Sequence, residues 1–182
     1  TSTNVTCFGL ANGIAAATTS NAIGAVNYSW IGGPSALSGQ TVTGLGAATY
    51  TLIATDQNNC IGNSIVTITQ PPVLTASITS SGSITCNGGN NGFAVVTPAG
   101  GTAGYTYSWS PSGGNAANAN TLIAGNYVAT VMDTKSCTAT ASVTILQPTP
   151  LATTLTTTNP KCNGSSDGTA NIAFAGGAGT TT

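Results

Sequence analysis

The sequence is nearly devoid of charge. Its 182 residues include no histidine, and the only charged side chains are Lys135, Lys161, Asp56, Asp133 and Asp167. A net charge of −1 provides no field that would attract nucleic acid or an anionic membrane, so we expect neither as a partner. The only general bases left are dispersed aspartates and lysines, which argues against an enzyme.

Long apolar runs and clustered cysteines are also missing. No stretch approaches the roughly 20 apolar residues that span a bilayer, so membrane insertion is not expected. No Cys-x-x-Cys pair is present, and we expect no metal and no cofactor. The chain begins at Thr1 and shows no signal peptide, which we interpret as a mature or excised piece of an exported protein.

What the sequence does contain is an internal repeat. Cysteines, aromatic residues, aspartates and a Gln-Pro pair recur at offsets of 76 to 79 residues, and such agreement indicates a tandem array. The recurring elements are Cys7, Cys86 and Cys162; Cys60 and Cys137; Tyr28-Ser29-Trp30 and Tyr107-Ser108-Trp109; Tyr50 and Tyr127; Asp56 and Asp133; Gln70-Pro71 and Gln147-Pro148.

The offsets divide the chain into a first repeat (1–74), a second repeat (75–151) and a partial third repeat (152–182). Short alternating runs rich in Thr and Val, separated by Gly/Asn turn clusters, predict strands, and no segment has a helical period. We therefore predict an all-β fold of tandem immunoglobulin-like sandwiches, in which the third repeat contributes only its first two strands.

The cysteines also support export. Each complete repeat has two, and their matched positions predict one disulfide per repeat, Cys7–Cys60 and Cys86–Cys137, with Cys162 unpaired. A bridge closing a loop of about 52 residues would stabilise a domain by roughly 4 kcal/mol in the chain-entropy model. The alternative is four buried free thiols.

A family resemblance follows from the order of the motifs. Residues 75–151 read Cys-Asn-Gly-Gly-Asn-Asn-Gly, then Gly-Gly-Thr-x-Gly-Tyr-Thr-Tyr-Ser-Trp-Ser, Ala-Gly-Asn-Tyr, Val-Met-Asp-x-x-x-Cys and Gln-Pro. This pattern resembles the SprB-type repeat of large secreted adhesins of gliding Bacteroidetes. The match is looser in 1–74 and covers only the opening of 152–182. The resemblance implies an extracellular or cell-surface location and no catalytic residues.

Two sets of residues have both a structural and a functional interpretation. Trp30 and Trp109 would pack against the disulfide of their repeat, with Tyr28 and Tyr107 on the same strand face, or else form a carbohydrate-stacking platform. Asp56 and Asp133 fit Asx-type turns better than calcium sites, because each complete repeat offers only this carboxylate.

Threonine-rich stretches are candidates for O-linked glycans, because a neutral β-protein needs another source of solubility. The candidate residues are Thr153, Thr154, Thr156, Thr157 and Thr158.

Three functions are compatible with the sequence: a subunit of an extracellular filament, a stalk segment of a long adhesin, and a module that binds glycan or ice. We favour the filament, assembled head to tail from copies of this chain. The partial third repeat has surplus strands, and the first repeat has a shortened opening strand, as strand addition between subunits would require.

Overall fold

The computed structural model describes residues 1–33 and 36–178, in which all regular secondary structure is β-strand. The chain divides into two compact units. The first consists of Thr1–Thr75, Pro98–Thr106 and Val131–Ala139, and the second of Ala76–Thr97, Tyr107–Thr130 and Thr140–Thr182. The predicted all-β fold with two immunoglobulin-like sandwiches and a partial third repeat is confirmed.

The first repeat is a sandwich of two antiparallel sheets, one ordered β1-β2-β5 and the other β4-β3-β6-β7. The strands are β1 (Ser2–Thr3), β2 (Gly13–Ala16), β3 (Asn27–Ile31), β4 (Leu37–Ser38), β5 (Thr41–Leu45), β6 (Ala48–Thr55) and β7 (Ile61–Ile68).

The core of the first repeat lies between these sheets. Alternate residues of β6 point inward, and Tyr50 and Leu52 are buried there beside Trp30 of β3. The opposite sheet contributes Ala15 and Leu45. A Cβ at Gly13 would lie 2.8 Å from the side chain of Ile68, so this glycine allows the two sheets to approach closely.

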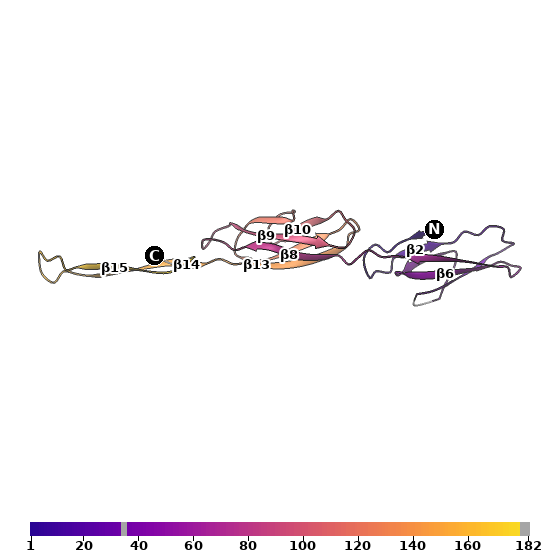
Figure 1. Cartoon of the computed structure of the whole chain (residues 1–182), viewed down its shortest axis with the longest axis horizontal. Coiled ribbons are helices and arrows are strands. Elements are labelled where there is room, and N and C mark those ends of the chain that lie inside the picture. The colour runs from indigo at the N-terminus through magenta and orange to yellow at the C-terminus, as the bar shows by residue number, and fades with distance from the viewer. Residues whose placement is uncertain (34–35, 179–182) are drawn as a thin grey trace. The chain divides into compact units, whose positions relative to one another are not determined.

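The second repeat has the same plan, with one sheet ordered β11-β9-β8 and the other β10-β12-β13 (Figure 1). Its strands are β8 (Thr75–Gly82), β9 (Gly92–Ala99), β10 (Thr106–Ser110), β11 (Asn118–Leu122), β12 (Gly125–Met132) and β13 (Thr138–Ile145). Gly92 lies against Ile145 as Gly13 lies against Ile68.

A buried tyrosine near the start of β6 and of β12 anchors each sandwich. Tyr50 and Tyr127 are each 2% exposed. Their hydroxyls donate to backbone oxygens four residues upstream, Tyr50 to Gly46 at 3.2 Å and Tyr127 to Ile123 at 3.1 Å. This arrangement is the tyrosine corner of immunoglobulin-like domains. It supports the fold class independently of the cysteines.

The partial third repeat forms a hairpin of β14 (Thr149–Thr158) and β15 (Thr169–Gly177) (Figure 1). The two strands are antiparallel, with Leu155 opposite Ile172. Every residue of β14 is exposed, because no second sheet covers either face. The repeat boundaries inferred from the sequence stay an interpretation.

The predicted disulfide pairing is wrong. The structure joins Cys7 to Cys137, with their Cα atoms 5.7 Å apart. Cys60, Cys86 and Cys162 are free and exposed. The bridge therefore connects the first repeat to the second, and it does not close either one. Trp30 and Trp109 are buried as expected, but no disulfide lies within their repeat for them to pack against.

The reason is the position of the two cysteines along the last strand of each sandwich. Cys60 immediately precedes β7, whereas the loop after Cys7 is bound to the far end of β7 through a hydrogen bond from Gly9 N to Gln70 Oε1. An eight-residue strand is roughly 25 Å long. A disulfide needs Cα atoms within about 7 Å, so the two cysteines of one repeat cannot meet.

Candidate assembly site

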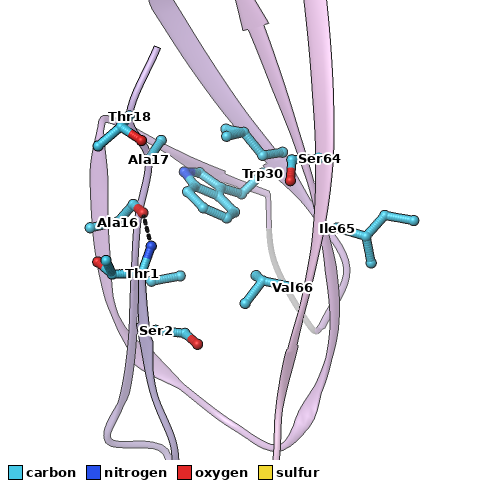
Figure 2. Close-up of a pocket in the computed structure, with 11 residues that line it drawn as sticks. Thr1, Ser2, Ala16, Ala17, Thr18, Trp30, Ser64, Ile65 and Val66 are labelled. Atoms are coloured by element: carbon cyan, nitrogen blue, oxygen red, sulfur yellow. Dashed lines mark hydrogen bonds between the residues drawn. The ribbon is translucent and has the colours of Figure 1, made fainter. Parts of the chain in front are cut away.

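A cleft opens at the side of the first repeat, next to β2 (Figure 2). Trp30 and Ser64 line it, and the amino group of Thr1 donates to Ala16 O at 2.9 Å across its rim. The other lining residues are Ser2, Ala15, Ala17, Thr18, Leu52, Ile65 and Val66. Ala16 N in turn donates to Thr1 O at 2.9 Å, so β2 is paired to its end, and the cleft lies beyond it, at Thr18 and beside part of the apolar interior.

The second repeat is covered at the corresponding place. The first half of β8 lies beside β9 there, with Thr75 Oγ1 donating to Ala99 O and Ser77 Oγ to Thr97 O, each at 3.3 Å. Ala141 of β13 is half-buried beneath this cover, whereas its equivalent Ser64 of β7 is exposed. The cleft of the first repeat is therefore the space that half a β-strand fills in the second.

The β14–β15 hairpin presents an apolar face to solvent. Leu155 is 62% exposed and Ile172 60%. Their equivalents in the second repeat are Ile78, which is half-buried, and Val96, which is 1% exposed. Side chains that belong to a sandwich core in one repeat are thus uncovered in the hairpin, which is typical of a surface that pairs with further strands.

The two buried aspartates organise the turns that precede Cys60 and Cys137. Asp56 accepts hydrogen bonds from the backbone N–H groups of Cys60 at 2.9 Å and Ile23 at 3.2 Å, and these lower its pKa. For Asp133, burial opposes ionisation, but hydrogen bonds from Thr102 and Cys137 outweigh it and also lower the pKa. These contacts are those of the Asx-type turn.

Neither tryptophan forms a surface platform. Trp30 is 3% exposed and Trp109 7%, and each indole N–H donates to a backbone oxygen, of Gly39 and Ala116 respectively, at 2.9 Å. Tyr28 and Tyr107 are half-buried beside them. The carbohydrate-stacking alternative therefore has no exposed tryptophan to support it.

The candidate glycan acceptors on β14 are all exposed. Thr158 Oγ1 is hydrogen-bonded to Thr169 Oγ1 at 2.8 Å, and Thr156 Oγ1 donates to Asn171 O at 3.4 Å. The hydroxyls of Thr153, Thr154 and Thr157 have no such bond across the hairpin in the described residues. Glycosylation of these threonines stays a prediction.

The part of the chain that the structure describes contains no group of three His, Cys, Asp or Glu residues that could hold a metal ion. It also contains no helix that could span a membrane.

The sequence reasoning missed the tyrosine corners. It also missed the apolar residues that stand where an immunoglobulin domain has a disulfide cysteine next to its buried tryptophan. In immunoglobulin domains, the second bridging cysteine lies two residues after the corner tyrosine. Leu52 occupies that position in the first repeat and Ala129 in the second, both buried. An apolar residue therefore stands two positions after Tyr50 and Tyr127, where an immunoglobulin domain has its cysteine. This was the sequence signal that could have excluded a bridge within the repeat.

Comparison with known proteins supports the motif analysis. The SprB repeat model matches residues 1–35 and 76–114. Among curated proteins, none matches the chain.

Two solved structures of immunoglobulin-domain proteins are similar, each at 13% identity. One, from work on Dscam isoform specificity, has a TM-score of 0.32 and covers 66% of this chain and 37% of that chain. The other, the N-terminal eight Ig domains of Down Syndrome Cell Adhesion Molecule isoform 1.30.30, has a TM-score of 0.33 and covers 72% and 23%. Likeness at this level transfers no function. The predicted resemblance to SprB repeats is confirmed for the two matched segments.

Proposed function

We propose that this chain is an extracellular structural protein, a repeat-built subunit of a surface filament that assembles head to tail. The SprB repeat is an adhesin-type repeat of bacterial cell surfaces, and this supports an extracellular location. The near absence of charge and the tandem sandwiches are consistent with a building element.

The observation that carries the proposal is the complementarity of two surfaces. The cleft in the first repeat is lined by Thr18, which follows the paired end of β2, and by the apolar side chains of Trp30 and Leu52. The hairpin offers β14, which has a free edge and the exposed side chain of Leu155. Leu155 is the equivalent of Ile78, which lies in the β8 segment that covers this place in the second repeat.

Strand addition follows from these two surfaces. The outer edge of β14 would pair with the segment that follows β2, at Thr18, in the next subunit, and Leu155 would enter the cleft. Because donor and acceptor are different surfaces of one chain, the contact is heterologous, and a heterologous contact that does not close into a ring produces a filament.

The donor side is tested with Leu155→Asp in the full chain. A carboxylate on this face cannot enter an apolar cleft, so we expect filaments to disappear while the far-ultraviolet circular dichroism is unchanged. Val128→Asp is the matched control, because Val128 is 41% exposed on β12 and lies outside both surfaces. Negative-stain electron microscopy and sedimentation velocity provide the readout.

The acceptor side is tested with Ser64→Trp, which fills the cleft from β7. Asn63→Trp places the same side chain on the opposite face of the strand and serves as the control. Assembly should stop in the first variant and persist in the second. Filaments that survive both Leu155→Asp and Ser64→Trp would overturn the proposed contact.

A stalk segment of a long adhesin is the second candidate, and the SprB match favours it. In that case further strands of the same polypeptide cover the hairpin. The intact mass of the native protein separates the two candidates: a short secreted chain indicates a subunit, and a chain of thousands of residues indicates a stalk. The same measurement would reveal O-linked glycans as mass beyond that of the polypeptide.

A further inference from the structure

We infer that the array is cross-linked by a running series of disulfides, in which the first cysteine of each repeat bonds to the second cysteine of the following repeat. Cys7–Cys137 is the one such bond that this chain contains. Cys86 and Cys162 would then each bond to the second cysteine of a following repeat, and Cys60 would bond to the first cysteine of a preceding repeat. The inference goes beyond the proposed function, because it holds for a filament subunit and for a stalk.

The first argument is that the loop after the first cysteine is built identically in both complete repeats. Gly9 N donates to Gln70 Oε1 at 2.8 Å, and Gly88 N donates to Gln147 Oε1 at 2.9 Å. A second bond, from the backbone N–H three residues after Cys7, Cys86 or Cys162 back to the cysteine carbonyl, recurs at 3.2, 3.0 and 3.1 Å. Cys86 therefore presents its thiol from the same scaffold as the bonded Cys7.

The loop before the second cysteine is equally well matched. Cys60 N and Cys137 N each donate to the preceding aspartate at 2.9 Å. The residue before each cysteine has a positive φ, 62° at Asn59 and 65° at Ser136. Cys60 thus has the backbone geometry that in Cys137 already supports an inter-repeat bond.

The linkers, residues 70–74 and 147–151, provide an independent observation, because each meets the repeat that follows it in the same way. Gly100 and Gly176, with φ of 74° and 81°, lie so close to a linker carbonyl that a Cβ would collide with it, the carbonyl of Val73 in one case and of Pro150 in the other. Only glycine fits both constraints. The linker into the partial third repeat therefore contacts its Gly-Gly turn as the preceding linker does.

Pairing of the remaining cysteines inside a repeat is excluded by distance. Cys86 is held near the far end of β13 through Gln147, whereas Cys137 precedes the start of that strand and is already bonded. Cys60 and Cys86 are both exposed, so each thiol is accessible to a partner from outside.

Formation of each bond is a two-electron oxidation. The two thiols, one from each repeat, lose two protons and two electrons and form one S–S bond. A disulfide oxidant accepts them and leaves as two thiols, so that oxidised glutathione, for example, yields two molecules of reduced glutathione. Such bonds persist in oxidising extracellular surroundings.

The test is an extended chain in which residues 1–151 are followed by residues 75–182, so that the second repeat occurs twice. After refolding with a glutathione redox pair, pepsin digestion at low pH and mass spectrometry identify the linked peptides without exchange. We expect Cys7 linked to Cys137 and Cys86 linked to Cys137. Absence of the second linked pair would overturn the inference.

Two serine variants show which copy of Cys86 is bonded. Cys86→Ser in the first copy should abolish the Cys86–Cys137 peptide, whereas Cys86→Ser in the second copy should leave it unchanged. The opposite result, or survival of the peptide in the first variant, would indicate a bond within one repeat and contradict the inference. Both serines replace an exposed side chain, and unchanged tryptophan fluorescence verifies folding.

Discussion

The two complete repeats have equivalent cores but differ in how one end of the core is covered. Ile68 and Ile145, which end the last strand of each sandwich, are 1% and 2% exposed. Further back along the same strands, Ser64 is exposed while Ala141 is half-buried. The second repeat has a full-length β8 over this place, and the first has the two-residue β1.

The burial of the core residues is nevertheless the same in the two repeats. Trp30, Tyr50 and Leu45 are as buried as their counterparts in the second repeat, although the cleft opens beside them. The difference between the two repeats is therefore confined to the cleft and does not reach the shared core positions.

The largest expected effect tests whether the two cores are equivalent. Tyr127→Ala removes a side chain that is 2% exposed and its bond to Ile123, and should lower the free energy of unfolding of the second repeat by about 3–5 kcal/mol, as for other large aromatic residues. Tyr50→Ala should do the same in the first repeat. Trp109 and Trp30 report the two transitions separately by fluorescence, each in a background where the other is phenylalanine.

A smaller effect is expected where the sheets approach most closely. Gly92→Val and Gly13→Val each place a side chain within 2.8 Å of an isoleucine methyl group, and should destabilise their repeats by about 1–3 kcal/mol through overpacking. Denaturant unfolding of the two variants should give similar losses. A loss confined to one repeat would show that the cores are not equivalent.

The covered and open ends should differ under one substitution. Ala141→Asp introduces a carboxylate into a half-buried position and should cost about 1–3 kcal/mol, whereas Ser64→Asp lies in the open cleft and should change stability by less than about 0.5 kcal/mol. Denaturation of the unassembled chain measures both. Equal costs would mean that the cleft is closed in solution.

A pH dependence is expected from the turn aspartates. Because their pKa values are lowered below 3.8 in the folded state, their contribution to stability is complete above that value and is lost as the pH falls through the lower folded pKa. Unfolding free energy should decline below about pH 4, and Asp133→Asn should flatten the decline in the second repeat alone. The pKa of Asp167 is also lowered, by the hydroxyl of Ser165, but this residue lies in the hairpin, so Asp167→Asn should leave the decline of both sandwiches unchanged and is the control.

Much of the fold could be predicted from the sequence, because the signals were local or repeated. Alternation identified strands such as β12 and β13, and the recurrence of whole motifs identified two complete repeats. The burial of Trp30 and Trp109 followed from their place on an alternating strand. These inferences needed no knowledge of which ends of the strands lie together.

The disulfide could not be obtained in the same way. Matched spacing of Cys7 with Cys60 and of Cys86 with Cys137 shows equivalence but not proximity. Strand direction decides proximity, since the loop after Cys7 is bound beyond the end of β7 through Gly9 and Gln70, whereas Cys60 precedes its start. The cleft was equally hard to predict, because the sequence does not show which strand covers which part of the core.

The central claim is that the cysteines connect successive repeats and do not close each one. The most direct test is disulfide mapping of the full chain after alkylation of free thiols and digestion at low pH. For the unassembled chain, the account predicts one linked pair, Cys7–Cys137, with Cys60, Cys86 and Cys162 alkylated. Recovery of Cys7 linked to Cys60, or of Cys86 linked to Cys137, would contradict it.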